Sequence, residues 1–483
     1  MGRPVTFDPI AGLRRRLDTE PDADVLISAT SSLTVSELWD SAARCAALLA
    51  TEGIGPGAVV GVELPPLLQP VFAVALWMRG AIGAIAPVGR GEELGDVLDV
   101  MVGRARREGF PAERFMQVDD AWLMRSAELD PTVEPFQWAD NDIARVVFSS
   151  GTTGAPKPIA FTVADLEERV NRGREFWMPT GPFLTILGIG AVSGSATFFA
   201  ALEGGIPYLV GGTSAENVAV LAKTGVPLVH GSPIQLSDLL SAAGRTDADL
   251  PGLRIVQSVG GVLSEELAAR LVRRFGAEIE IIYGSTEVGG VTLRRGAPIA
   301  PGDVGAILPF ATIEAVGAEG EPVADGEEGL IRVRRPRQAR GSFRGMLDDA
   351  TFRDGWFFPG DVGRIADGHL IVVGRRDELI NAAGIKVDPE RVERVALRFP
   401  GVGDAVAVGV EDARGVSVVA LAVVADSAVD LAELRAALVR ELGDAAPRVL
   451  ERIAVVPRTV SGKARRLEVA ADLRARLGRA IEF

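Results

Sequence analysis

The chain has 483 residues and a formal net charge of −14, and 47% of its residues are hydrophobic and 24% charged. This length calls for about two to four domains rather than one core, and the acidic balance argues against a nucleic-acid partner, which would need a basic face. Because Cys45 is the only cysteine and His230 and His369 are the only histidines, disulfides within the chain are excluded and Cys/His metal clusters are disfavoured.

The first part of the chain alternates helix-like and strand-like segments. Ser36 can cap a helix that stops at Gly53. The apolar face of this helix includes Leu38, Ala42, Cys45, Ala46 and Leu49. A buried strand at 58–64 (AVVGVEL) and a helix at 67–78 (LLQPVFAVALWM) follow, and similar segments recur at 253–276 and at 278–284. This alternation predicts an α/β fold.

The pattern changes near Val304, where short strands alternate with glycine-rich and acidic turns. We predict a β-rich subdomain at about 304–376, with strands at 311–316, 329–335, 361–366 and 369–374. A small α+β unit follows the charged GRRDE at 374–378, with helices at 389–399 and 431–442 and strands at 404–410, 416–424 and 451–456. The predicted domains are therefore a large domain at 1–376 and a small C-terminal lobe at 377–483.

One uncharged run, from Trp177 to Leu202, is long enough to span a membrane. Its prolines and glycines instead favour a loop, a strand, a glycine turn and a helix in succession. The first residues, MGRPVTFDPI, lack the apolar core of a signal peptide. We therefore expect a cytoplasmic protein without a membrane partner.

A polar loop, SSGTTGAPKP at 149–158, follows the apolar strand-like run RVVF. Backbone N–H groups freed by glycine, several hydroxyls and one lysine suit a phosphate chain; an ordinary polar surface turn is the alternative. Lysine is scarce, with only four among 51 Lys and Arg residues, and three of the four lie in glycine-bearing loops. A lysine kept against such a bias is a candidate for chemistry. The expected phosphate-binding residues are Ser150, Gly151, Thr152, Thr153, Gly154 and Lys157.

Five motifs follow in order along the chain. They are SSGTTGAPK at 149–157, SVGGVLS at 258–264, IIYGSTEVGG at 281–290, GWFFPGDVGRI at 355–365 running on to VVGRRDELINAAGIKVDPERVE, and PRTVSGKARR at 457–466. Together they resemble the adenylate-forming superfamily of acyl-CoA synthetases, amino-acid adenylation domains and beetle luciferases. The resemblance covers nearly the whole chain and implies that the loop holds the β- and γ-phosphates of ATP while a carboxylate attacks the α-phosphate.

The resemblance also assigns roles to single residues. Such a displacement needs groups that neutralise developing negative charge. By resemblance, Lys463 on the terminal lobe reaches the reacting groups, Thr286 contacts the α-phosphate and Glu287 holds Mg²⁺ through oxygen. The nucleotide would also contact Tyr283 and Gly284, Gly260 and Gly261 beside the adenine, and Asp361 and Arg375 at the ribose, with Asp377 at the hinge of a mobile lobe.

Each of these residues also has a structural interpretation. Tyr283 could be a core aromatic, Glu287 an acid near a helix N-terminus and Asp361 a turn cap. Their joint occurrence in the order of the superfamily favours the functional roles.

Some positions depart from the pattern of the superfamily. Pro359 stands where threonine is usual, and Pro158 where glycine commonly follows the loop lysine. The loop expected to line the thiol tunnel, Ala382, Ala383, Gly384 and Lys386, has lost one glycine. The added methyl groups could narrow the tunnel. Adenylation is therefore better supported than thioester formation with CoA, and a partner protein that takes acyl-AMP or a carrier-protein thiol stays an alternative acceptor.

The expected acid pocket lacks a partner for an α-amine. Amino-acid adenylation domains have an aspartate near the start of the pocket helix, and GIGAVSG at 188–194 offers none. We expect a small-molecule carboxylic acid that is not an α-amino acid. The pocket residues are Gly188, Gly190, Ala191, Gly194 and Ser285, whose small size indicates either a roomy apolar pocket or close packing of strand and helix.

Two other classes of protein compete with an adenylating enzyme. A kinase or NTPase with a P-loop is disfavoured, because G-x-x-x-x-G-K-[ST] occurs nowhere in the chain. A non-catalytic nucleotide sensor is disfavoured by the presence of Lys463 and Glu287. The cofactors that the resemblance implies are ATP and Mg²⁺, with CoA as co-substrate.

Overall fold

The structure is a computed structural model of the whole chain. It describes residues 7–85, 94–149, 157–246, 249–263, 265–317, 319–338, 343, 351–376, 380–382, 385–411, 417–458 and 464–480. Within these ranges the side chains at 149, 157, 266, 381–382, 385–386, 411, 417, 444, 467 and 477–480 are not described.

The helices before residue 377 pack against two β-sheets. They are α1 (Pro9–Thr19), α2 (Val35–Thr51), α3 (Leu68–Met78), α5 (Asp120–Ala127), α6 (Val163–Phe176), α7 (Val192–Gly204), α8 (Ser214–Thr224), α9 (Pro233–Thr246) and α10 (Glu265–Phe275). The helices of the C-terminal part are α11 (Pro389–Leu397), α12 (Leu431–Leu442) and α13 (Arg466–Ala480).

A first sheet has the order β6-β5-β3-β4-β7-β8 and is parallel except for the last pair. Its strands are β3 (Val59–Glu63), β4 (Ile82–Ile85), β5 (Val100–Gly103), β6 (Phe115–Gln117), β7 (Ile143–Ser149) and β8 (Lys157–Thr162). The expected phosphate loop connects β7 to β8, and α6 follows β8 directly.

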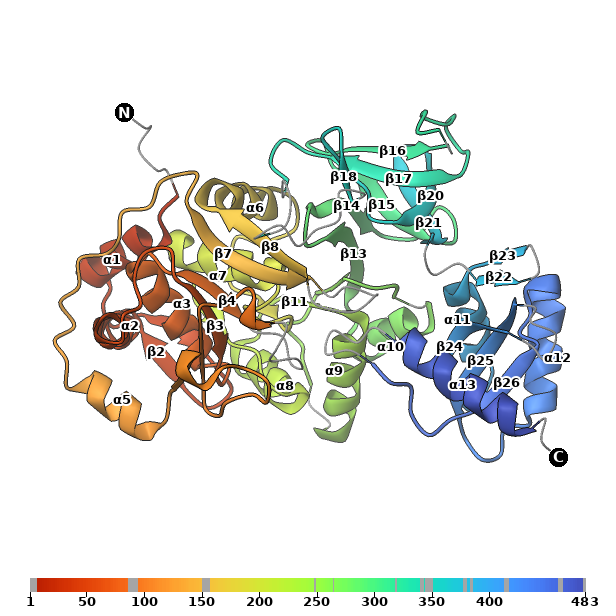
Figure 1. Cartoon of the computed structure of the whole chain (residues 1–483), viewed down its shortest axis with the longest axis horizontal. Coiled ribbons are helices and arrows are strands. Elements are labelled where there is room, and N and C mark those ends of the chain that lie inside the picture. Colours follow the sequence, from red (N-terminus) through yellow and green to blue (C-terminus); the bar gives the residue numbers. More distant parts are fainter. Residues whose placement is uncertain are drawn as a thin grey trace.

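A second, 15-stranded sheet runs through the middle of the molecule (Figure 1). Its parallel part contains β1 (Asp24–Ile27), β9 (Leu184–Thr185), β10 (Tyr208–Leu209), β11 (Leu228–Gly231), β12 (Ile255–Val259) and β13 (Glu278–Ser285), with β2 (Ser32–Thr34) at one edge. The antiparallel part contains β14 (Gly289–Arg295), β15 (Asp303–Ile307), β16 (Thr312–Val316), β17 (Gly329–Arg334), β18 (Phe352–Arg353), β19 (Trp356–Phe357), β20 (Asp361–Ala366) and β21 (His369–Arg375).

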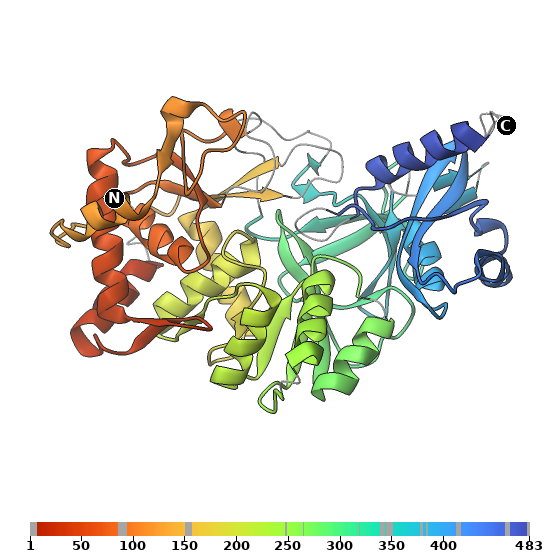
Figure 2. The same cartoon turned by 90° about the horizontal axis from the view of Figure 1, so that it is seen from below.

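The C-terminal lobe lies at one end of the molecule, drawn in blue in Figures 1 and 2. Its sheet has the order β24 (Val402–Glu411), β25 (Ser417–Ala425) and β26 (Val449–Arg452), and a hairpin pairs β22 (Ile380–Ala382) with β23 (Ile385–Val387). Two hydrophobic clusters in this lobe are built only from residues after 379. The lobe therefore has apolar cores of its own.

Apolar packing determines which helices cover which sheet. One cluster joins α2, α3, α6 and α7 to strands of both sheets, namely β3, β7 and β8 of the first sheet and β1 and β10 of the second. A second cluster joins α8, α9 and α10 to one face of β9, β11 and β12, and these helices lie side by side in Figure 2. This two-sided cover is what a parallel sheet requires.

Most predicted elements are confirmed within a few residues. The first difference is the cap of α2: Thr34, not Ser36, accepts from the backbone N–H of Glu37, and the Glu37 carboxylate accepts from the N–H of Thr34. This reciprocal pair satisfies two free N–H groups at once. The strand expected at 451–456 is β26, which starts and ends earlier, and α13 was not predicted.

The predicted change of pattern near Val304 does not interrupt the sheet, because β14 pairs with both β13 and β15. No helix in the described part of the chain has the length and apolarity to cross a membrane. The run from Trp177 to Leu202 instead contains β9 and α7.

A row of polar side chains crosses the second sheet at one level. His230, Gln257, Glu280 and Arg295 are successive partners on neighbouring strands β11 to β14. His230 Nδ1 contacts Gln257 Oε1 at 3.1 Å, and Gln257 Nε2 donates to Glu280 Oε2 at 2.7 Å and to the carbonyl oxygen of Trp177 at 2.8 Å. The row thereby binds the chain at the end of α6, which keeps this helix at a fixed position on the sheet.

Burial of His230 predicts an acid-dependent loss of stability. Burial lowers the pKa of His230 from 6.5 to about 4, so between these values the unfolded chain binds a proton that the folded chain does not. Stability therefore falls as pH drops through this window, by about 2–3 kcal/mol between about pH 7.5 and pH 4.5. Measured by urea unfolding, the free energy of unfolding of His230→Gln should fall less than that of the wild type over this pH range, and the difference should equal this amount. Parallel pH profiles for the two proteins would contradict the assignment.

Candidate active site

Three of the predicted nucleotide-binding residues meet in one cluster. The Tyr283 hydroxyl, at the end of β13, donates to Asp361 Oδ2 at the start of β20, although the residues are 78 positions apart. Arg375 Nε, at the end of β21, lies 3.5 Å from Asp361 Oδ1, and the two residues are direct partners across β20 and β21. The sheet therefore assembles a phenol, a carboxylate and a guanidinium group from three strands.

Burial and the Asp361 carboxylate keep the Tyr283 hydroxyl protonated. Burial, followed by the negative charge of Asp361, raises the pKa of Tyr283 well above 10, so the phenol stays a hydrogen-bond donor. Arg375 Nη2 also donates to the carbonyl oxygen of Pro359 at 2.8 Å. Arg375 therefore binds the backbone at the position where proline departs from the superfamily pattern. Contacts of this cluster with adenine or ribose stay predictions.

The predicted metal ligand lies in the turn between β13 and β14. Glu287 is 9% exposed, and its carboxylate has no hydrogen bond or ion pair to any residue that the structure describes. No group of three or more His, Cys, Asp or Glu residues in the described ranges could hold a metal. A carboxylate that accepts no hydrogen bond from the described residues fits Mg²⁺, which prefers oxygen ligands and shares its shell with substrate phosphates.

The glycines of the site have different physical reasons. Gly260 has φ +81°, with no atom within 4 Å of the place where a Cβ would stand, so its backbone conformation favours glycine there. A Cβ on Gly261 would make only ordinary contact with Pro233 at 3.5 Å. A Cβ on Gly284 would lie 1.9 Å from the carbonyl oxygen of Gly289, so Gly284 allows the close approach within the β13–β14 hairpin.

Four predicted acid-pocket residues lie between β9 and the first turn of α7, and the fifth, Ser285, is the last residue of β13. A Cβ on Gly194 would meet the carbonyl oxygen of Gly188 at 1.8 Å, and one on Gly190 would meet Ile85 at 3.0 Å. Close packing therefore explains these two glycines. Gly188 has φ +72° and open space around it, and Ala191 is the residue before α7. Ser285 uses its hydroxyl to accept from the N–H of Val288 at 3.4 Å.

Several predicted residues lie outside the described ranges. They are Ser150, Gly151, Thr152, Thr153, Gly154, Asp377, Ala383, Gly384 and Lys463. Lys157 begins β8, Ala382 ends β22 and Lys386 lies on β23, and only their backbones are described. The roles of all these residues stay predictions.

Two arginines beside the site were not predicted from the sequence. Arg169 donates to the carbonyl oxygens of Thr286 and Glu287, and Arg335 donates to that of Val288. Arg169 follows Leu166 by three residues on the buried face of α6. A charged residue at an apolar position of an amphipathic helix was the available signal, but it was hidden in a chain where nearly all cations are arginine.

Comparison with known proteins decides the family. The AMP-binding enzyme family matches residues 13–343, and the AMP-binding enzyme C-terminal domain matches residues 391–463. The first match alone covers more than half of the chain. The chain belongs to the AMP-binding enzyme family.

The similar proteins differ in length. The chain is 29% identical to 2-hydroxy-7-methoxy-5-methyl-1-naphthoate–CoA ligase of Streptomyces carzinostaticus, over 86% of this chain and 84% of that protein. It is 29% identical to feruloyl-CoA synthase of Amycolatopsis sp, over 94% and 97%. It also matches chalcone synthase cfoA of Aspergillus candidus at 28% identity, over 91% of this chain but only 18% of that protein.

A solved structure shares the fold over nearly the whole chain. The anthranilate CoA ligase AuaEII in complex with anthranoyl-AMP superposes with a TM-score of 0.85 at 20% identity, covering 98% of this chain and 99% of that one. The predicted superfamily, the α/β fold with a smaller α+β C-terminal part, and the enzyme class of AMP-forming ligases are confirmed.

The Tyr283–Asp361–Arg375 cluster leads to a prediction for this member of the AMP-binding enzyme family. Asp361→Asn keeps the shape of the side chain but removes the charge that faces Arg375, so we expect KM for ATP to rise about tenfold or more. Tyr283→Phe, which removes only the hydroxyl, should have a smaller effect. Steady-state kinetics with varied ATP measures both, and equal KM values for Asp361→Asn and the wild type would contradict the role.

Proposed function

We propose that the protein activates a carboxylic acid with ATP and transfers the acyl group to CoA. In the first step a carboxylate oxygen bonds to the α-phosphorus, and the bond from the α-phosphorus to the bridging oxygen breaks. Pyrophosphate leaves with that electron pair, and acyl-AMP remains. In the second step a thiolate attacks the acyl carbon, and AMP leaves as the thioester forms. The observation that carries this proposal is the Tyr283–Asp361–Arg375 cluster beside the Glu287 turn, in a chain of the AMP-binding enzyme family.

The described residues would bind and orient the nucleotide. Asp361 and Arg375 lie together where the ribose would be held, and the Tyr283 ring belongs to the same cluster. Thr286 would contact the α-phosphate. Lys463, from the C-terminal lobe, would stabilise the charge that develops between the carboxylate and the phosphate.

Glu287 would hold Mg²⁺ with its unpartnered carboxylate. The bound ion neutralises negative charge on the phosphates of the nucleotide. The protein contributes a ligand whose backbone is fixed by Arg169, because the Glu287 carbonyl oxygen accepts from Arg169 Nη2 at 2.9 Å.

The acid is proposed to be aromatic and to lack an α-ammonium group. No acidic side chain occurs in the segment 188–194 to pair with an amine. Three of the similar proteins are named for aromatic acids: a naphthoate–CoA ligase, a feruloyl-CoA synthase and an anthranilate CoA ligase. A planar apolar ring would suit small residues such as Gly188 and Ala191.

A second candidate is an enzyme that stops at acyl-AMP and passes it to a partner protein or a carrier-protein thiol. The added methyl groups at Ala382 and Ala383 favour it, since CoA would have to pass this segment after the lobe from residue 377 has rotated.

The first half-reaction is tested by exchange of labelled pyrophosphate into ATP with a panel of benzoic, naphthoic and cinnamic acids beside aliphatic and α-amino acids. We expect exchange with at least one aromatic acid. The proposal is refuted if only α-amino acids support exchange, or if none of the acids does.

The second half-reaction is tested with the confirmed acid, Mg-ATP and CoA. Formation of acyl-CoA supports the first candidate, whereas accumulation of acyl-AMP without thioester supports the second. If Ala382→Gly with Ala383→Gly then restores thioester formation, the narrowed segment is the cause. If it does not, the block lies elsewhere.

A further inference from the structure

Two buried arginines bind one turn of the site from behind. Arg169 Nη2, on α6, donates to the carbonyl oxygens of Thr286 at 3.1 Å and Glu287 at 2.9 Å. Arg335, directly after β17, donates through Nη1 to the carbonyl oxygen of Val288. Three consecutive carbonyl groups therefore accept hydrogen bonds from two guanidinium groups.

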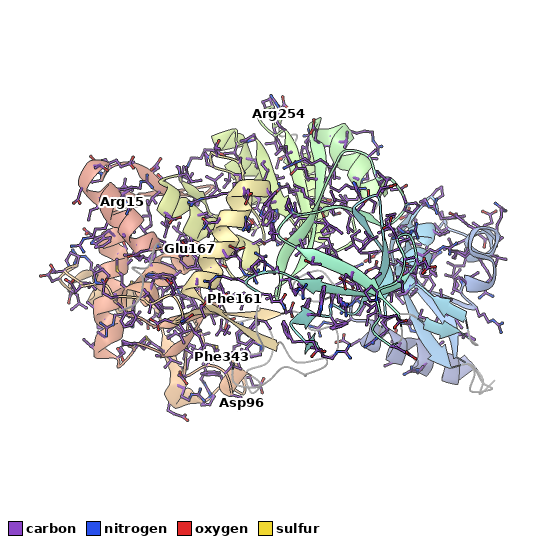
Figure 3. The ribbon with its side chains drawn as sticks, turned by 90° about the horizontal axis from the view of Figure 1, so that it is seen from above. Arg15, Asp96, Phe161, Glu167, Arg254 and Phe343 are labelled. Carbon is purple, nitrogen blue, oxygen red and sulfur yellow. The ribbon has the colours of Figure 1, made fainter. Side chains whose placement is uncertain are left out.

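Both guanidinium groups are removed from water. Arg169 and Arg335 are each 5% exposed, and they lie over the rings of Phe161 at 4.5 Å and Phe310 at 4.8 Å. Phe161, labelled in Figure 3, lies on β8, so the aromatic cover comes from the strand that follows the phosphate loop. Burial, together with Arg335, lowers the pKa of Arg169 to about 9. Two buried like charges oppose folding unless they are paired.

Acidic side chains offset only part of this positive charge. Glu168 Oε1 lies 3.5 Å from Arg335 Nη2, and Asp165, Glu168 and Glu287 attract Arg169. Among the described residues, Nε and Nη1 of Arg169 and Nε of Arg335 have no hydrogen-bond partner. The carbonyl groups of the turn are therefore the main hydrogen-bond acceptors of this pair.

Gly289 lets the guanidinium groups pack directly against the turn. It has φ +69°, and a Cβ there would lie 2.5 Å from Arg169 Nη1 and 3.1 Å from Arg335 Nη1. A side chain at this position would displace the Arg169 guanidinium group and press against that of Arg335. The absence of a side chain at Gly289 therefore leaves room for both guanidinium groups beside the backbone of the turn.

We propose that Arg169 and Arg335 are positioning residues that hold the turn in the orientation in which Thr286 and Glu287 face the nucleotide. A peptide flip in the turn would break a charge-assisted hydrogen bond. Because α6 follows the phosphate loop through β8, Arg169 also links that loop to the turn. The inference rests on the proposed adenylation reaction.

The test replaces each arginine with glutamine and measures acid-dependent pyrophosphate exchange at varied Mg²⁺. We expect kcat to fall about 10- to 100-fold and the half-saturating Mg²⁺ concentration to rise about tenfold, because small misplacements of reacting groups are costly. The thermal shift that Mg-ATP causes should shrink as well. Affinity for a non-hydrolysable acyl-AMP mimic should fall less than affinity for Mg-ATP, since the mimic uses the Thr286 contact but needs no metal.

Matched controls on the same elements lack contact with the turn. Arg174→Gln on α6 breaks a pair with Glu203, and Arg332→Gln on β17 breaks a pair with Glu314. Both should keep wild-type kcat and Mg²⁺ dependence. Guanidinium ion at concentrations that leave the wild type folded should restore part of the exchange activity of Arg169→Ala.

Two outcomes overturn the inference in folded variants: unchanged kcat and Mg²⁺ dependence, or equal losses for Mg-ATP and the mimic. If Arg169→Gln does not fold, Arg335→Gln, which removes one carbonyl contact, decides alone. If neither folds, the pair serves the fold and the inference fails. If no acid of the panel supports pyrophosphate exchange by the wild-type protein, the proposed function is refuted instead.

Discussion

Lys463→Ala is expected to lower acid-dependent pyrophosphate exchange by about 10²-fold or more, while ATP binding changes little. The ammonium group is proposed to stabilise charge that develops only as the carboxylate attacks the α-phosphate, so its loss acts on the transition state more than on the bound nucleotide. Exchange kinetics gives the rate, and calorimetry with ATP gives the affinity.

Lys223→Ala is the matched control for this lysine. Lys223 is near the end of α8, where its exposed Nζ lies 3.3 Å from the carbonyl oxygen of Ser28. Its replacement should leave exchange at the wild-type rate. Near-wild-type exchange in Lys463→Ala would remove this residue from the proposed chemistry.

Glu287→Gln is expected to reduce the exchange rate by about 10²-fold at moderate Mg²⁺, with partial recovery as Mg²⁺ is raised. The substitution preserves side-chain shape and the backbone carbonyl that Arg169 binds, but removes the negative charge offered to the metal. A titration of exchange rate against Mg²⁺ concentration measures the effect.

Glu203→Gln is the control for the loss of a carboxylate. Glu203 is on α7 and pairs with Arg174 at 2.6 Å, away from the turn. Its Mg²⁺ dependence should match that of the wild type. If Glu287→Gln shows the same dependence as this control, the metal is held by other groups.

Local patterns were sufficient where an element depends on neighbouring residues. The strand β13, with Tyr283 near its end, follows from the EIEIIY pattern, in which isoleucines alternate with glutamates before an apolar end, and from the glycine after it. The cap of α2 was placed two residues too late, because Thr34 and Ser36 are both good caps and only Thr34 has a glutamate three residues on. Competing local signals of similar strength are decided by such reciprocal contacts.

The helix and strand patterns of the sequence by themselves indicated the α/β fold, and the resemblance of its ordered motifs to the superfamily indicated the family and the candidates Tyr283, Glu287, Asp361 and Arg375. Only the tertiary structure decided which of them touch. Tyr283 reaches Asp361 because strand order and register bring together residues distant in the chain. Likewise, only the tertiary structure shows that Arg169 and Arg335, among many arginines, donate to three carbonyl groups of one turn. Buried polar groups need such hydrogen-bond partners. Pairing over such distances depends on sheet register and burial, which local sequence preferences do not encode.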